Sequence, residues 1–124
     1  MIFKSALLCL ALNIHFEARG ESTEGQIAVA HVTMNRARYN HTDICHEVFK
    51  KGQFSWTRKK FKIPSGEEWE KSKLMAQKAL VSNDSVNGAL FFFNPKKCHP
   101  KSVVSGRRGV KVIGDHVFYA NINK

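Results

Sequence analysis

The sequence predicts a single α+β domain that is mainly helical and ends in a small β-hairpin. Three observations support this prediction. The chain has 124 residues, which suits one compact domain. Segments rich in helix-forming residues fill much of the chain, and β-prone residues gather near its end. Helices followed by strands, rather than alternating with them, are typical of the α+β class. We therefore expect residues 1–124 to form one domain.

Two helices are predicted at the start of the chain. Residues 5–18 are rich in leucine and alanine and apolar nearly all round, which predicts a buried helix. Gly20 is a natural stop at its C-terminal end. Thr23 and Gln26 have the spacing of a capping box, in which Thr23 caps a second helix that runs to about Arg38. One face of this helix is marked by Ile27, Ala30 or His31, Met34, and Ala37 or Arg38.

The middle of the chain is predicted to be irregular before a third helix begins. Residues 40–62 contain a glycine and many aromatic residues, and they show no clear period. Ser65 and Glu68 match a second capping box, which opens a helix through about Val81. A common stripe on this helix is formed by Trp69, Ala76 and Leu80.

The β-prone residues lie in the last part of the chain. Residues 89–93 include three consecutive phenylalanines and indicate a short buried strand. Residues 96–108 are expected to form a basic loop. Residues 110–113 and 116–120 flank the pair Gly114-Asp115, and a two-residue Gly-Asp loop between β-prone runs is a good hairpin signal.

The composition limits the class of protein and its partners. Hydrophobic residues make up 43% and charged residues 24%, which is typical of neither a disordered nor a membrane-spanning chain. The formal net charge is +10, which suits nucleic acid, an anionic membrane surface or an anionic cell envelope. The apolar start of the chain resembles a weak signal peptide. It continues into the first helix without a small-x-small cleavage site, so we expect no export signal and no membrane anchor.

The chain contains three cysteines, and this odd number argues against a complete disulfide framework. Small buried thiols are the simplest expectation. A bridge between Cys45 and Cys98 is left open for the case that the protein reaches an oxidising compartment.

Glu17 is the most distinctive candidate for chemistry. It is predicted at the C-terminal end of a buried helix, where partial negative charge disfavours a carboxylate, and Phe16 and Ile14 would add apolar surroundings. Both effects raise its pKa, as general-acid cleavage of a glycosidic bond requires. Arg19 would act in the opposite direction if it were close. Alternatively, Glu17, Arg19 and Glu21 would form a solvated ion-pair cluster.

A series of motifs along the chain favours the catalytic interpretation. They are residues 17–30, Asn35-Arg36, Ile44-Cys45, Gln53-Phe54-Ser55-Trp56, Phe92-Phe93-Asn94-Pro95 and residues 113–119. In this order they resemble the SleB-type cell wall hydrolases, which include spore-cortex-lytic enzymes and many wall hydrolases of phages and bacteria. The blocks cover nearly the whole chain. The resemblance implies a fold similar to that of lysozymes and lytic transglycosylases.

The resemblance also implies a reaction. The first glutamate of the motif is catalytic in the family, which places the catalytic role on Glu17 here. Glu21 is expected to hold the turn or to pair with Arg19. A lytic transglycosylase breaks the bond between MurNAc and GlcNAc and leaves a 1,6-anhydro ring on the muramyl sugar. It needs no second carboxylate, no metal and no cofactor. A hydrolytic muramidase stays open as an alternative.

Several residues are expected to bind the substrate. An aromatic platform with polar neighbours suits a sugar, because the apolar ring face stacks while hydroxyl groups find partners. The family resemblance favours this role for Ser55 and Trp56, whereas Phe54 is expected in the core. Asn94 could bind an N-acetyl group or cap its turn. The expected substrate-binding residues are Gln53, Ser55, Trp56, Asn94, His116 and Tyr119.

The resemblance and the charge also indicate partners and location. A basic catalytic domain without an export signal resembles a phage endolysin. We therefore expect synthesis in the host cytoplasm without a cleavable signal peptide, and action at the periplasmic cell wall. The expected partners are peptidoglycan strands, the anionic cell envelope and a holin for release, with the protein as a monomer.

Two alternatives belong to other classes. A zinc amidase would draw its ligands from His41, Cys45, His46, Cys98 and His99, although no H-E-x-x-H motif or C-x-x-C pair is present. A nucleic-acid binder would use the basic runs at residues 58–60 and 107–108. No nucleic-acid-binding motif accompanies these runs, so no nucleic acid partner is expected.

Overall fold

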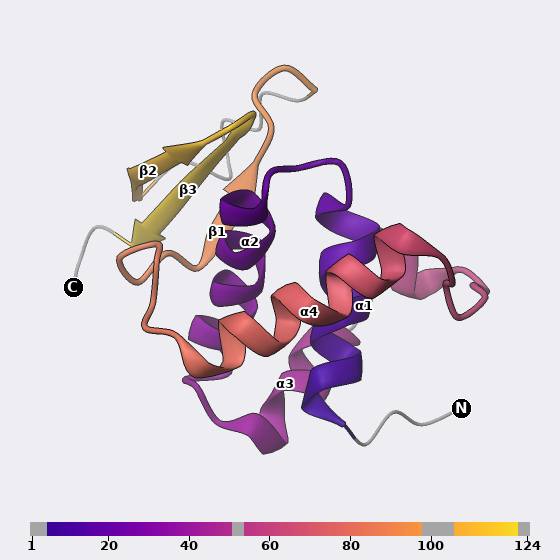
Figure 1. Ribbon diagram of the computed structural model, residues 1–124. Coiled ribbons are helices and arrows are strands. Elements are labelled where there is room, and N and C mark those ends of the chain that lie inside the picture. The colour runs from indigo at the N-terminus through magenta and orange to yellow at the C-terminus, as the bar shows by residue number, and fades with distance from the viewer. Residues whose placement is uncertain (1–4, 51–53, 98–105, 122–124) are drawn as a thin grey trace.

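The computed structural model describes residues 5–50, 54–97 and 106–121, and it confirms the α+β class (Figure 1). Helices pack together on one side, and a small antiparallel sheet lies beside α2 on the other. The elements are α1 (Ala6–Ala18), α2 (Thr23–Arg36), α3 (His41–Val48), the 3-10 helix η1 (Ser55–Arg58), α4 (Glu67–Val81), β1 (Phe91–Phe93), β2 (Arg107–Ile113) and β3 (His116–Asn121).

The first helix forms as predicted, and the start of the second differs. The central residues of α1 are buried, in agreement with its apolar sequence. The cap of α2 is Ser22, whose hydroxyl accepts the Gly25 N–H at 3.1 Å, and Thr23 is already helical. Gln26 donates to the carbonyl oxygens of Arg19 and Glu21 instead of completing a capping box. The predicted capping box is therefore wrong, because a serine one residue earlier takes the cap position.

The second helix ends two residues before the predicted position. Arg38 and Tyr39 have φ values of 53° and 57°, in the left-handed region that stops a helix. The Tyr39 N–H donates to the Met34 carbonyl oxygen at 2.7 Å and closes the turn. Glycine usually occupies such positions, since a residue with a side chain loses roughly 1–2 kcal/mol there. Neither residue is a glycine, so the sequence gives no stop signal.

The segment predicted to be irregular contains a helix and a helical turn. The Asn40 side chain accepts the Thr42 N–H at 3.0 Å and caps α3. Ile44 and Val48, one turn apart, are fully buried and hold this short helix on the core. The turn η1 follows at residues 55–58, beside the aromatic residues that the sequence concentrates there.

The fourth helix ends at Val81 as predicted, but its cap residue differs. Gly66, with φ 97°, is the cap residue of α4, and no side chain caps it, so the predicted capping box is wrong. Instead, three glutamates in the first turn stabilise the helix through their attraction to the partial positive charge of its N-terminus. Trp69 and Ala76 are buried and Leu80 is half-buried, which confirms the predicted stripe.

The sheet contains the predicted hairpin and the strand expected within residues 89–93, which covers Phe91–Phe93 and is half-buried rather than buried. Its order is β1-β3-β2, with every neighbouring pair antiparallel. Gly114 and Asp115 form the two-residue connection, as predicted, while β2 begins at Arg107, within the expected basic loop. Phe92 pairs with Phe118, and both pack towards α2.

Two clusters of buried side chains lie on either side of α2. The helical cluster gathers residues of α1, α2, α3 and α4, including Leu10, Leu12 and Met34. The sheet cluster joins Val29 and Val32 of α2 to residues of the sheet. The helix α2 therefore connects the helical layer to the sheet.

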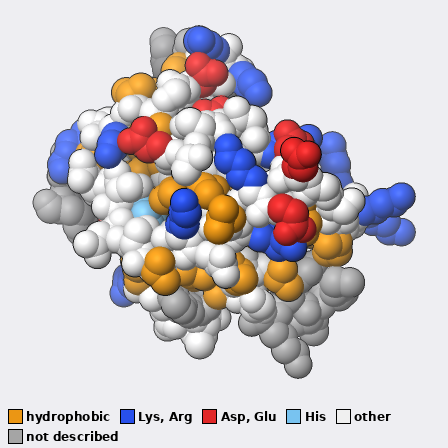
Figure 2. All heavy atoms as spheres, in the orientation of Figure 1, with side chains coloured by type: hydrophobic (Ala, Val, Ile, Leu, Met, Phe, Trp, Pro, Cys, Tyr) orange, Lys and Arg blue, Asp and Glu red, His pale blue; other side chains and the backbone are white. Residues whose placement is uncertain are grey.

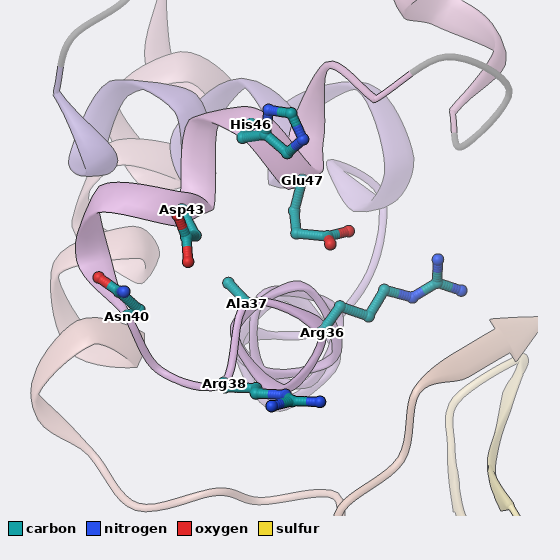
Figure 3. Close-up of a pocket in the computed structure, with 7 residues that line it drawn as sticks. All are labelled: Arg36, Ala37, Arg38, Asn40, Asp43, His46 and Glu47. Carbon is teal, nitrogen blue, oxygen red and sulfur yellow. The ribbon is translucent and has the colours of Figure 1, made fainter.

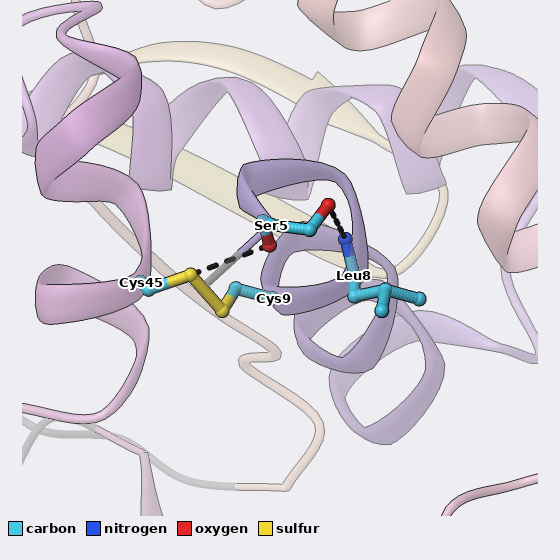
Figure 4. Close-up of a disulfide and its surroundings, with 4 residues drawn as sticks. All are labelled: Ser5, Leu8, Cys9 and Cys45. Carbon is cyan, nitrogen blue, oxygen red and sulfur yellow. Dashed lines mark hydrogen bonds between the residues drawn. A yellow bond between two sulfur atoms is a disulfide. The ribbon is translucent and has the colours of Figure 1, made fainter. Parts of the chain in front are cut away.

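A disulfide between Cys9 and Cys45 joins α1 to α3 (Figure 4). Cys45 Sγ lies 3.3 Å from the Ser5 carbonyl oxygen, a contact rather than a hydrogen bond because a disulfide sulfur carries no proton. This pairing corrects both sequence expectations, namely buried free thiols and a bridge from Cys45 to Cys98. Cys98 itself lies outside the described residues.

One surface of the helical layer is apolar. Figure 2 shows hydrophobic side chains gathered over the middle of the face that α4 crosses. A hollow of about 350 Å³ there is lined by Leu7, Leu74, Gln77, Lys78, Leu80 and Val81. None of the helices in the described ranges is both long and apolar enough to cross a membrane.

Candidate active site

Glu17 occupies the last turn of α1, and its side chain is half-buried. Burial raises the pKa of its carboxyl group above the ordinary value, while hydrogen bonding from the Trp56 side chain acts in the opposite direction. The net rise has the predicted direction. Glu17 is therefore a carboxyl group that holds its proton more strongly than an exposed glutamate.

An aromatic cluster surrounds this end of α1. The Phe16 and Trp56 rings stack with centroids 4.8 Å apart, and the Phe61 ring contacts both from the side. Phe49 also packs against Trp56, with ring centroids 5.8 Å apart. The cluster anchors η1 to α1, so the fold itself brings Trp56 to Glu17.

The indole N–H of Trp56 is a notable group within this cluster. It is buried, and among the described residues no acceptor meets it with full hydrogen-bond geometry. It nevertheless lies near enough to the Glu17 carboxyl group to lower that pKa. Trp56 is therefore the hydrogen-bond donor that acts on the Glu17 carboxyl group.

A second contact joins the turn after α1 to the hairpin. The Glu21 carboxylate and the His116 Nδ1 atom are 3.6 Å apart, and both side chains are largely buried. Burial lowers the pKa of His116, although the Glu21 carboxylate opposes this shift. A Cβ atom at Gly114 would lie 2.9 Å from Glu21 Oε1, so a side chain there would displace the Glu21 carboxylate from its present position. Glu21 thus connects α1 and α2 to the sheet.

The charged residues around Glu17 do not form the solvated cluster that the sequence left open. Arg19 Nε lies 4.0 Å from a Glu68 carboxylate oxygen, and both side chains are well exposed. Glu21 faces His116 instead of Arg19. Glu17, Arg19 and Glu21 therefore lie in three different environments. Of these three residues, Glu17 is the one beside the aromatic cluster.

The other predicted binding residues are spread over the molecule. Ser55 is exposed at the start of η1, and Phe54 is buried as expected. Asn94 Oδ1 accepts the Lys96 N–H at 2.8 Å, which is the turn-capping role. Tyr119 stacks on Phe93 with ring centroids 5.3 Å apart.

Strand geometry separates two of these residues. Alternate residues of a strand point to opposite faces, so Tyr119 and His116 lie on opposite faces of β3. His116 lies on the inner face and contacts the Phe92 ring, with centroids 5.3 Å apart. The structure therefore brings His116 to Glu21 and Trp56 to Glu17, and Tyr119 belongs to another surface. Gln53 lies outside the described residues.

The proposed zinc ligands are not brought together as the amidase alternative required. Cys45 is bonded to Cys9 and cannot act as a thiolate ligand. Within residues 5–50, 54–97 and 106–121, no group of three or more potential ligands is placed to hold a metal ion. Cys98 and His99 lie outside those ranges.

Sequence reasoning missed the residues that support the site. Phe49 and Phe61 pack around Trp56, and the density of aromatic residues in this segment was their only signal. The Glu21–His116 contact joins positions far apart in the chain, and no local pattern indicates it.

The chain is similar to known proteins in both sequence and fold. Residues 20–119 match the family model of the cell wall hydrolases, and Glu17 lies just before that range. The spore cortex-lytic enzyme of Oceanobacillus iheyensis is 31% identical over 118 residues, which cover 88% of this chain and 39% of that protein. The corresponding enzyme of Bacillus subtilis is 30% identical over 117 residues, covering 88% and 35%. The chain thus spans well under half the length of these curated relatives.

Two solved structures are similar over almost their whole length. The catalytic domain of the germination-specific lytic transglycosylase SleB from Bacillus anthracis has a TM-score of 0.76 and 27% identity, covering 96% of this chain and 97% of that one. The catalytic domain of the Bacillus cereus SleB protein has a TM-score of 0.75 and 27% identity, covering 97% and 93%. The fold described above is therefore shared with these catalytic domains.

Proposed function

This chain belongs to the cell wall hydrolase family, and from that premise we propose that it cleaves the glycan strands of peptidoglycan as a lytic transglycosylase. The half-buried Glu17 carboxyl group, with its raised pKa and its place beside Trp56, carries the proposal. The similarity to two SleB catalytic domains, one of them named as a lytic transglycosylase, supports the same reaction.

The proposed reaction uses Glu17 twice. Its protonated carboxyl group donates a proton to the oxygen that links MurNAc to GlcNAc, and the bond from that oxygen to the muramyl C1 breaks. The resulting carboxylate accepts the proton of the muramyl C6 hydroxyl, whose oxygen then bonds to C1. A 1,6-anhydro ring forms and Glu17 is protonated again, so each cycle restores the acid. The attacking group belongs to the same sugar, which favours the step through proximity.

The surroundings of Glu17 suit both steps. Burial raises the pKa of Glu17 and so favours the protonated acid that the first step needs. The nearby Trp56 N–H stabilises the carboxylate that the first step leaves, because a donor favours the charged form. The aromatic cluster also offers ring surface for a sugar to stack on. Glycosidases that use two carboxylates differ, since their second one acts on water or on the sugar.

The location of the reaction is also a proposal. The Cys9–Cys45 disulfide suits a protein that acts outside the reducing cytoplasm, and the net charge of +10 suits an anionic cell envelope. We place the activity at the periplasmic wall of a host cell, as a monomeric phage endolysin released by a holin. Lysis that occurs when the protein is expressed with a holin, and not without one, would support this biological role.

The decisive experiment analyses the products released from purified sacculi. We expect the wild-type protein to release muropeptides with anhydro-muramyl ends, identified by mass spectrometry. The Glu17→Gln variant should keep its circular dichroism spectrum and lose activity, and Glu24→Gln, on the exposed first turn of α2, should retain it. Cleavage by Glu17→Gln at the wild-type rate would refute the assignment. Hydrated, reducing muramyl ends would indicate a hydrolytic muramidase instead.

A further inference from the structure

Two adjoining hollows lie at the end of α2 remote from the Glu21 turn. The larger, of about 580 Å³, lies between the end of α2 and α3 (Figure 3). The smaller, of about 260 Å³, extends to Leu90 and Phe91 at the start of β1. Both are lined by Arg36, Arg38 and Glu47, so they form one continuous depression. Its volume falls in the range of small-molecule binding sites.

Positive charge gathers on one side of this depression. Arg38 and Lys50 line the smaller hollow, and in the described part of the chain neither side chain takes part in an ion pair. The guanidinium groups of Arg36 and Arg107 lie over the Phe91 ring, 4.7 Å and 3.5 Å from its centroid. Burial lowers the pKa of Arg36, the Glu47 carboxylate opposes this shift, and the nearby Arg107 adds to it. Arg38 and Lys50 are therefore the lining cations that favour the binding of an anion.

The backbone that presents Arg38 is unusual. Arg38 and Tyr39 are consecutive residues in the left-handed region, which glycine adopts at lower cost. Packing accounts for Tyr39, whose ring stacks on His31 with centroids 6.3 Å apart. The Arg38 N–H donates to the Asn35 carbonyl oxygen at 3.0 Å, so its conformation belongs to the turn that ends α2. This turn places Arg38 in the lining of both hollows.

The other side of the depression is acidic. Figure 3 shows the Asp43 and Glu47 carboxylates on α3 facing the depression opposite the arginines of α2. A polymer with negative charges only, such as a nucleic acid or a polyphosphate, would gain from Arg38 and Lys50 and be repelled by these carboxylates. The arrangement suits a ligand that carries both carboxylates and an ammonium group.

The depression is also placed to meet a long substrate. The helix α2 has 14 residues, so Arg36 lies roughly 20 Å along its axis from the turn that holds Glu21. Phe91 opens β1, which leads to Asn94, and Lys50 precedes Phe54 and Trp56 in the chain. The depression is therefore separated from the Glu21 turn by about the length of α2, and only an extended substrate would reach both places.

We propose that this depression binds a peptide stem of the glycan strand, a short peptide that bears carboxylates together with the ammonium group of a diamino acid. The proposal rests on the proposed function, since a peptidoglycan strand presents such peptides at regular intervals along the sugar chain. Arg38 and Lys50 bind the carboxylates, and Asp43 binds the ammonium group. The enzyme thereby prefers strands that carry peptides over strands from which the peptides have been removed.

Binding is tested directly with the free stem tetrapeptide and the full chain. We expect saturable shifts of the Arg38 and Lys50 amide signals in an NMR titration. Affinity should fall about fivefold to tenfold in Arg38→Gln/Lys50→Gln, in line with the loss of charged hydrogen bonds. The control Lys71→Gln/Lys78→Gln loses the same charge from α4 and should bind as the wild type does. Asp43→Asn should reduce the preference for the tetrapeptide over the same peptide with its amine acetylated.

Activity gives a second readout. The wild-type protein should cleave peptide-bearing strands with a lower KM than peptide-free strands, and Arg38→Gln/Lys50→Gln should raise only the former KM while kcat is unchanged. Tetrapeptide binding that survives Arg38→Gln/Lys50→Gln, or inorganic phosphate that competes with the peptide at equal concentration, would overturn the inference. If the wild type cleaves neither strand, the proposed function fails, and the titration still decides whether the depression binds the peptide.

Discussion

Loss of the Cys9–Cys45 disulfide should strongly destabilise the fold. The two cysteines are 36 positions apart, and closing a loop of this length lowers the entropy of the unfolded chain by an amount worth about 4 kcal/mol at 25 °C. For a domain of this size, such a loss corresponds to a fall in Tm of roughly 12–20 °C. Cys9 of α1 lies in the helical core and Cys45 of α3 is partly buried against it, so the whole helical layer should be affected.

The assay is denaturant unfolding followed by circular dichroism, on the oxidised protein, on the protein with reductant, and on Cys9→Ala/Cys45→Ala. The reduced protein and the double variant should unfold at similar, lower denaturant concentrations. Cys98→Ser should unfold as the oxidised wild type does, because it leaves the bridge intact. Equal unfolding midpoints with and without reductant would show that the bridge does not constrain the unfolded chain, and the entropic reasoning would then be wrong.

Three further predictions concern protons and close contacts. Trp56→Phe removes a donor that lowers the pKa of Glu17, so the alkaline limb of the pH–activity profile should move to higher pH. A limb that stays in place would show that Trp56 does not affect the pKa of Glu17. Burial lowers the pKa of His31, so the folded state binds fewer protons than the unfolded one, and the free energy of unfolding should fall as the pH drops from about 6.5 through the folded pKa. His31→Leu, measured in parallel at pH 7.5 and pH 5, should show a smaller fall. Gly114→Ala, at φ 57° and against Glu21, should lower the unfolding free energy by about 1–2 kcal/mol, whereas Gly20→Ala, with open space around it, should change it little.

The parts of the fold that the sequence predicted are those with strong local signals. The apolar run of α1 and the Gly114-Asp115 pair each determine an element through nearby residues alone. The short helix α3 was missed because eight residues give little more than two turns over which a helical period can repeat. This helix is stabilised because Ile44 and Val48 are buried in the core. Such tertiary packing cannot be inferred from the neighbouring residues in the sequence.

The predictions of the helix caps and of the disulfide pairing were wrong for different reasons. Ser22 and Thr23 are both good caps, and the spacing from Thr23 to Gln26 favoured the wrong one. Three cysteines allow several pairings, and sequence alone cannot choose among them. Cys9 was assigned to a buried helix, which is correct, yet a buried position does not reveal that Cys45 packs against it.

The candidate site was predicted only as far as its individual residues. The raised pKa of Glu17 followed from its helix end and apolar neighbours, and burial turns out to be the main cause. The approach of Trp56 depends on a cluster of rings from three segments, and the partner of Glu21 lies on the last strand. Such contacts are set by how the layers pack, which one sequence does not display.

The position of α2 between two separate cores has a mechanical consequence. Both β1 and β2 contact α2, Ala18 of α1 packs in the same cluster, and the Glu21–His116 contact is a further tie between sheet and helices. The sheet is thus held on one side of α2, whereas the disulfide cross-links the helices on its other side. A substitution that shifts α2 would therefore move His116 relative to the helix that carries Glu17.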